Sequence, residues 1–83
     1  MLDRVDFAAR TLELVRPYAP ALPADDAAAR TVLLGDAGLR SMSAVKLMLA
    51  LEAEFQVAIP DAALTPENFA TVESIATLIA SLR

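Results

Sequence analysis

Five prolines divide this chain of 83 residues and limit where helices can form. Proline lacks a backbone N–H and disfavours the helical conformation in the residue before it. Pro17, Pro20 and Pro23 predict that a first helix ends near residue 17, and Pro60 predicts that a second helix ends before it. Helices are therefore expected in the stretches that these prolines leave free.

Three of those stretches have apolar residues at helical spacing. We expect the first helix over Asp3 to Arg16. The second stretch, Ser41 to Phe55, has no proline or glycine, and apolar residues cover more than half of its circumference, so we expect it to be the central helix. The third follows Thr71, which is expected to cap a helix that continues to Leu82.

The connections between these helices carry weaker signals. Residues 18–40 form a long connection with an Ala-rich patch at 27–29 and an apolar Val32-Leu33-Leu34 that is expected to reach the core. The order Thr65-Pro66 predicts a short helix near residues 66–70, although the preceding four residues can supply a turn as well. The predicted fold class is all-α, a small four-helix bundle of three main helices and one short helix, forming one domain over residues 1–83.

The residue types that are missing exclude most enzyme classes. The chain has neither cysteine nor histidine, so it lacks thiolate nucleophiles, the usual general base at neutral pH and the commonest zinc ligands. The pair Asp25-Asp26 is interpreted as part of a solvated loop, and Asp36 as a turn residue between glycines. The sequence therefore predicts a protein that is not an enzyme and has no metal site.

Charge and hydropathy limit the partners. A net charge of −4 argues against nucleic acid, which requires a basic stripe. No stretch approaches the roughly 18 unbroken apolar residues of a membrane span, and charged residues near Met1 interrupt any secretory signal. We therefore expect a soluble, cytoplasmic monomer that binds neither nucleic acid nor membranes.

Ser41 stands at the start of the predicted central helix, where a serine is most simply an N-cap. A series of features in fixed order surrounds it: Leu34-Gly35-Asp36, Gly38-Leu39-Arg40-Ser41-Met42, Val45, Leu47, Leu51-Glu52-Ala53-Glu54-Phe55, Ile59-Pro60-Asp61 and Asn68-Phe69-Ala70-Thr71-Val72. This order resembles the acyl carrier protein family of phosphopantetheine-binding domains over residues 33–82. The resemblance makes Ser41, and not the neighbouring Ser43, the family's modified serine, because of the spacing to Val45 and Leu47.

The resemblance implies that a phosphopantetheinyl transferase esterifies Ser41 with the 4′-phosphopantetheine of coenzyme A. The arm would hold acyl intermediates as thioesters, passed to it by a loading ligase or transferase and on to downstream biosynthetic enzymes. The leading interpretation is a discrete acyl carrier protein of a polyketide, fatty-acid-like or other specialised pathway. The alternatives are an aminoacyl or peptidyl carrier loaded by an adenylating ligase and an unmodified helical interaction module in which Ser41 is only a cap.

Two positions depart from the family pattern. Arg40 stands where the family usually has an acid, and Lys46 where it usually has glutamate. With Glu52 and Glu54 they make the helix neutral, and either they are solvated surface charges or they select a non-standard partner.

Apolar residues of the same helix are further candidates for partner contact. We expect Arg40, Met42, Val45, Lys46 and Glu52 to take part in partner recognition. Met42 and Val45, with Met48, would instead line a groove for the arm, or belong to the ordinary core.

Overall fold

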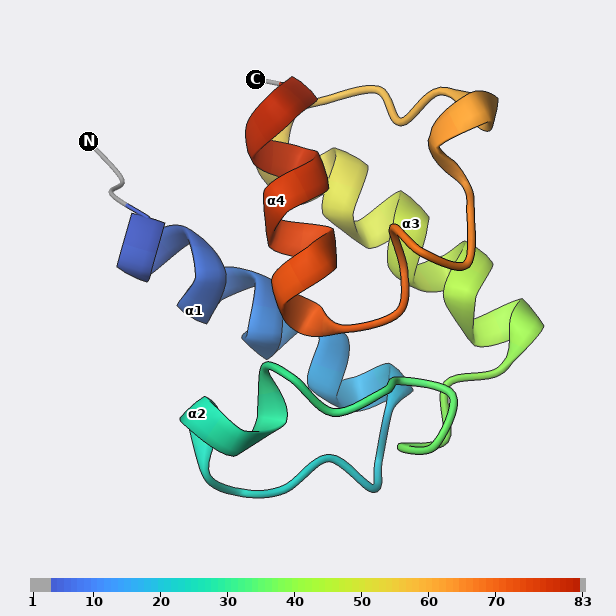
Figure 1. Cartoon of the computed structure of the whole chain (residues 1–83). Coiled ribbons are helices and arrows are strands. Elements are labelled where there is room, and N and C mark those ends of the chain that lie inside the picture. The colour runs from blue at the N-terminus through green and yellow to red at the C-terminus, as the bar shows by residue number, and fades with distance from the viewer. Residues whose placement is uncertain (1–3, 83) are drawn as a thin grey trace.

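The computed structural model describes the backbone of residues 4–82 and the side chains of residues 8–82 (Figure 1). Its α-helices are α1 (Arg4–Val15), α2 (Asp26–Ala29), α3 (Ser41–Phe55) and α4 (Val72–Leu82). Short 3₁₀ helices, η1 (Arg16–Tyr18) and η2 (Asp61–Ala63), follow α1 and precede α4. The described residues contain no strand, so the predicted all-α bundle with three main helices and one short helix is confirmed.

Helix α1, and not α3, is the helix against which the other α-helices pack. It packs against α4, α3 and α2 (Figure 1). The largest fully buried side chains come from α1, α3, α4 and the connection before α3: Thr11, Leu12, Val15, Leu34, Leu47, Leu51, Val72, Ile75 and Ile79. No helix of residues 4–82 is long and apolar enough to cross a membrane.

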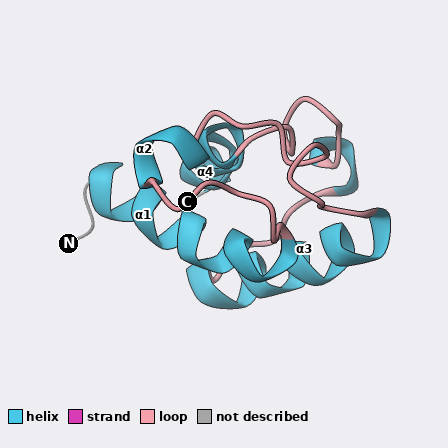
Figure 2. Ribbon diagram, turned by 90° about the horizontal axis from the view of Figure 1, so that it is seen from below, coloured by secondary structure: helices cyan, strands magenta, loops and turns pink. Residues whose placement is uncertain are grey.

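The expectation that α3 is the central helix is wrong. In Figure 2, α3 runs along one edge of the molecule, and only Leu47, Leu51 and Phe55 of its side chains are buried. The shorter α4 buries four residues. Alanine, leucine and methionine favour a helix on whichever face they lie, but one apolar face is enough to attach the helix to a core.

The short helix lies in the connection between α1 and α3, whereas the sequence predicted it near residues 66–70. The Ala-rich patch forms α2, and Asp25 caps it by accepting a hydrogen bond from the Ala28 N–H at 2.8 Å. Asp26 pairs with Arg16 at 2.9 Å. Both aspartates are exposed, as expected, but they stand at the start of α2 and not in a loop.

The short helix predicted near residues 66–70 is only a turn. Thr65 Oγ1 does accept from the Asn68 N–H at 3.2 Å, as a cap would. The chain then turns away, because the Ala70 carbonyl accepts from the Leu34 N–H at 2.8 Å. That bond holds Leu34 in the core, whereas the adjacent Leu33 is 55% exposed, so only part of the apolar stretch reaches it.

The cap predicted for the last helix is confirmed. The Ser74 N–H donates to Thr71 Oγ1 at 3.0 Å, and the Thr71 N–H donates to Ser74 Oγ at 3.0 Å. These reciprocal bonds satisfy two donors at the start of α4.

Candidate functional site

Ser41 is the first residue of α3. The preceding residue, Arg40, has an extended backbone, and its carbonyl accepts the Ala44 N–H at 2.7 Å. Arg40 therefore occupies the N-cap position, and the interpretation of Ser41 as the N-cap is wrong. The Ser41 side chain is exposed, and its hydroxyl has no hydrogen-bond partner in the part of the chain that the structure describes.

The loop that leads to Ser41 is held against the connection after α1. The Ala21 N–H donates to the Ala37 carbonyl at 2.9 Å. Gly38 has φ +100°, and a Cβ placed on it would lie 3.2 Å from Cδ of Pro20. The left-handed conformation and the close approach of Pro20 both favour glycine at this position. The start of α3 is thus attached to the rest of the bundle.

The first turn of α3 has no side-chain cap. No side chain accepts from its amides and no acidic residue lies in the turn. The N–H groups at a helix start have no intrahelical acceptor, and the helix dipole adds positive potential there. Ser43 shares this turn but is half-buried, which agrees with its interpretation as a first-turn polar residue. An anion attached to Ser41 would meet amide donors and the exposed Arg40.

One face of α3 is apolar and exposed. Met42 is 78% exposed, Val45 55% and Leu49 55%. With the exposed Lys46 they follow the i, i+3, i+4, i+7 spacing of a single helix face. Met48 instead packs against the core. Met42 and Val45 therefore do not belong to the core.

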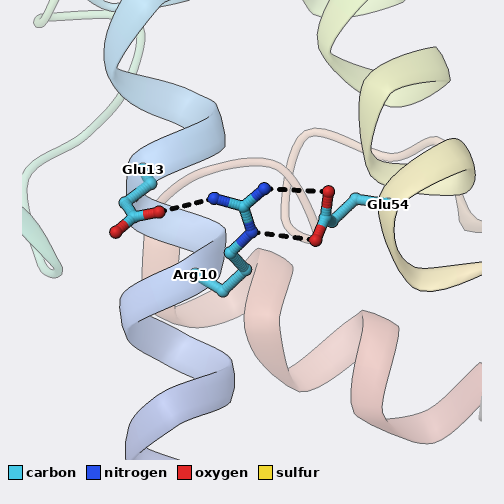
Figure 3. Close-up of polar contacts among 3 residues, drawn as sticks. All are labelled: Arg10, Glu13 and Glu54. Atoms are coloured by element: carbon cyan, nitrogen blue, oxygen red, sulfur yellow. Dashed lines mark hydrogen bonds and ion pairs between the residues drawn. The ribbon is translucent and has the colours of Figure 1, made fainter.

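The two acidic residues of α3 are engaged within the fold. Arg10 binds Glu54 with two hydrogen bonds of 2.9 Å, and its guanidinium also bonds Glu13 (Figure 3). The hydrogen bond from Arg10 lowers the pKa of Glu54. Glu52 accepts the Ile59 N–H at 2.7 Å. The carboxylate of Glu52 thus supports the turn after α3, a role the sequence did not suggest.

The expected neutrality of α3 is therefore misleading. Arg40 and Lys46 are exposed and form no ion pair with any side chain of residues 8–82. The helix thus has unpaired positive charge near Ser41 and acids bound to the fold at its far end. Leu49 was not identified from the sequence as an exposed residue of this face, because the apolar spacing alone does not distinguish it from the buried leucines.

No group of three or more acidic side chains that could hold a metal ion occurs among the described residues. Asp36 lies exposed in the turn before Ser41, and its N–H donates to the Leu33 carbonyl at 3.0 Å. Its interpretation as a turn residue is confirmed.

A protein-family model described as the phosphopantetheine attachment site matches residues 18–79. Two curated proteins of Bradyrhizobium diazoefficiens, aminoacyl carrier protein 1 and aminoacyl carrier protein 2, are 50% and 48% identical to the chain over 46 residues. The matched stretch covers 55% of this chain and 51% and 52% of those relatives. The chain thus matches about half the length of its curated relatives.

Solved structures with the same fold contain carrier proteins bound to a ligase. The first is engineered Bradyrhizobium japonicum glycine:[carrier protein] ligase complexed with carrier protein from Agrobacterium tumefaciens and ATP. The match has a TM-score of 0.74 and 29% sequence identity, and it covers 90% of this chain and 97% of the matched chain. The second is the Bradyrhizobium japonicum ligase complexed with glycylated carrier protein. This match has a TM-score of 0.65 and 37% sequence identity, and it covers 90% of this chain and 96% of the matched chain.

Proposed function

Because the chain belongs to the family of phosphopantetheine-attachment domains, whose members bear this prosthetic group covalently, we propose that Ser41 is the attachment residue and that the arm holds an aminoacyl group as a thioester. The observation that carries the proposal is the free, exposed hydroxyl of Ser41 at the uncapped start of α3. A carrier needs a side chain that a modifying enzyme can reach, and Ser41 meets this need better than the half-buried Ser43.

The residues around Ser41 fit a phosphodiester. The first-turn amides of α3 and the guanidinium of Arg40 would supply donors for its oxygens, and no acid in the first turn would repel its charge. Once bound, the group supplies the thiol that a chain without cysteine lacks. The fold presents the hydroxyl, and the loop anchored at Gly38 and Pro20 restrains it. No described side chain bonds the hydroxyl to activate it, which fits activation by the modifying transferase.

A labelling experiment tests the attachment residue. The chain is incubated with coenzyme A, magnesium and a broad-specificity phosphopantetheinyl transferase, and its intact mass is measured. We expect a mass gain of one phosphopantetheine, which Ser41→Ala abolishes and Ser43→Ala retains. If several transferases give no gain, the chain is an interaction module that is not modified.

The names of the relatives support an aminoacyl cargo over the acyl cargo of the leading sequence interpretation. The curated relatives are aminoacyl carrier proteins, and the structural relatives are complexed with a glycine:[carrier protein] ligase. The modified chain is offered amino acids with this ligase and ATP, or fatty acids with acyl-carrier ligases. Thioester formation with an amino acid supports the proposal, and loading by the acyl ligases alone restores the acyl interpretation.

A further inference from the structure

The loop that leads to α3 rests on a second turn, which follows η1 and which we call the proline turn, residues 19–22. The Ala19 carbonyl accepts the Leu22 N–H at 3.1 Å, which places Pro20 at the second position of a β-turn, where proline is favoured. Ala19 and Leu22 are buried, whereas Pro20 and Ala21 are exposed. The buried ends attach the proline turn to the core and proline restricts its backbone, so the turn is a rigid support.

The chain folds tightly over residues 33–39, and this segment lies against the proline turn. The Ala21 N–H donates to the carbonyl of Ala37, which is only 1% exposed. Within the segment, the buried Leu34 accepts the Leu39 N–H at 2.9 Å. The segment is therefore fixed by its own hydrogen bonds and by one bond from the proline turn.

Gly38 links the buried Ala37 to the residues that enter α3. Its φ of +100° is a conformation that side-chain-bearing residues rarely adopt, and a Cβ on it would lie 3.2 Å from Cδ and 3.4 Å from Cγ of Pro20. Gly35, in the same segment, has no positive φ, and a Cβ on it would meet nothing within 4 Å. The proline ring therefore lies against the backbone at the residue where the chain turns toward Ser41.

We propose that Pro20 is a positioning residue for the attachment of phosphopantetheine. Its ring, placed against Gly38, fixes the direction in which the chain enters α3, and with it the place of the Ser41 hydroxyl. This inference rests on the proposed function, because it concerns how Ser41 is presented to the modifying transferase.

The attachment reaction depends on where the Ser41 oxygen lies. This oxygen forms a bond to the phosphorus that bears the pantetheine of coenzyme A, the bond from that phosphorus to the adenosine bisphosphate breaks, and a base of the transferase takes the hydroxyl proton. The attacking and leaving oxygens must lie roughly in line. A displacement of about 1 Å can lower such a rate about a hundredfold.

A purely structural role of Pro20 predicts a different kinetic change. The carrier is the substrate of the transferase, so a carrier that is only partly folded requires more transferase for half-saturation but reaches the same saturating rate. A misplaced hydroxyl lowers the saturating rate itself. The two roles can therefore be separated in one experiment.

The test follows attachment by intact mass over time, with coenzyme A, magnesium and the transferase in excess over the carrier. Rates measured against transferase concentration give the saturating rate and the half-saturating concentration. We expect Gly38→Ala to lower the saturating rate about tenfold and Pro20→Ala about threefold, with smaller changes in the half-saturating concentration.

The chain offers a matched control for each variant. Gly35→Ala adds the same methyl group in the same segment, where it meets no neighbouring atom. Pro23→Ala removes another proline ring but keeps the carbonyl that accepts from Arg16 at 2.9 Å. Both controls should keep the saturating rate of the wild type, and circular dichroism confirms that each variant is folded.

A double variant tests the contact between Pro20 and Gly38 directly. Alanine at position 20 lacks the ring atoms that a Cβ at position 38 would approach. Gly38→Ala/Pro20→Ala should therefore react no more slowly than Gly38→Ala alone. Independent effects would instead multiply to a loss of about thirtyfold.

Several outcomes would overturn the inference. Wild-type saturating rates in Gly38→Ala and Pro20→Ala would show that Pro20 does not position Ser41, although attachment at Ser41 would stand. Raised half-saturating concentrations alone would limit Pro20 to stability or docking, and equal losses in Gly35→Ala and Gly38→Ala would exclude the specific contact. If Gly38→Ala does not fold, the comparison of Pro20→Ala with Pro23→Ala decides. A wild-type chain that gains no mass would instead refute the proposed function.

Discussion

The two faces of α3 use similar side chains in opposite ways. Leu49 is 55% exposed, whereas Leu51, two residues later, is completely buried. Lys46 has no acidic partner among the described side chains, whereas Glu52 and Glu54 are bound to a backbone amide and to Arg10. The comparison shows that the face of the helix with Leu47, Leu51 and Phe55 attaches it to the bundle. The face with Leu49 remains available for other molecules.

The largest expected effect separates the two leucines. Leu51→Ala should lower the free energy of unfolding by about 2–5 kcal/mol, because it leaves a cavity in the core. Leu49→Ala should change it by less than about 1 kcal/mol, since that side chain already contacts solvent. Urea unfolding followed by circular dichroism measures both values. Equal losses would show that the two faces of α3 are built into the core alike.

The next effect concerns two charged residues of α3, Glu52 and Lys46. Glu52→Ala should destabilise the fold by about 1 kcal/mol, because the partly buried Ile59 N–H loses its acceptor. Glu52→Gln retains an acceptor oxygen and should cost less. Lys46→Ala serves as the control and should stay within about 0.5 kcal/mol of the wild type in the same urea experiment. A larger loss for Lys46→Ala than for Glu52→Ala would contradict the comparison.

The Arg10–Glu54 pair should make the stability of the fold depend on pH. The folded state lowers the pKa of Glu54, so the pair's contribution to stability is present above the ordinary glutamate pKa of about 4.3 and is lost as the pH falls through the lowered value. Glu54→Gln should therefore show a flatter decline of stability in this acidic range than the wild type. Urea midpoints measured between neutral and acidic pH test this.

The control for this profile is Glu67→Gln. Glu67 is exposed and has no ion pair within residues 8–82. An identical flattening in this variant would mean that the Arg10–Glu54 pair does not cause the acid dependence.

The bounds of α3 could be predicted from the sequence because they depend on local features. No glycine or proline interrupts Ser41 to Phe55, and the structure places both ends of the helix there. The start of α4 was equally local, because Thr71 and Ser74 bond each other across one helical turn. Ser41 could be singled out from the order of residues that follows it.

The orientation of α3 could not be predicted, because it depends on other helices. A helix that is apolar on most sides does not indicate which side faces α1. The pairing of Arg10 with Glu54 joins residues 44 positions apart, so neither helix reveals it alone. The pairing of Asp26 with Arg16, ten positions earlier, was not predictable for the same reason.

The smallest expected effect is on the stability of the N-terminal end of α3 after modification. The first-turn amides have no side-chain cap, so a phosphodiester on Ser41 would supply the missing acceptor at the positive end of the dipole. Attachment should therefore raise the free energy of unfolding by about 0.3–1 kcal/mol. The urea midpoint measures this, and hydrogen exchange at the amides of Met42 and Ser43 should slow.

Arg40 and Lys46 provide the matched variants for this effect. Arg40→Gln, at the N-cap, should reduce the gain, because the guanidinium adjacent to Ser41 contributes to the positive potential that the phosphodiester meets. Lys46→Gln lies more than one turn away and should leave the gain nearly intact, since the dipole effect is confined to the first turn. If attachment leaves stability and exchange unchanged, the N-terminal end of α3 has no unsatisfied donors that an anion can use, and its exposed surface serves recognition alone.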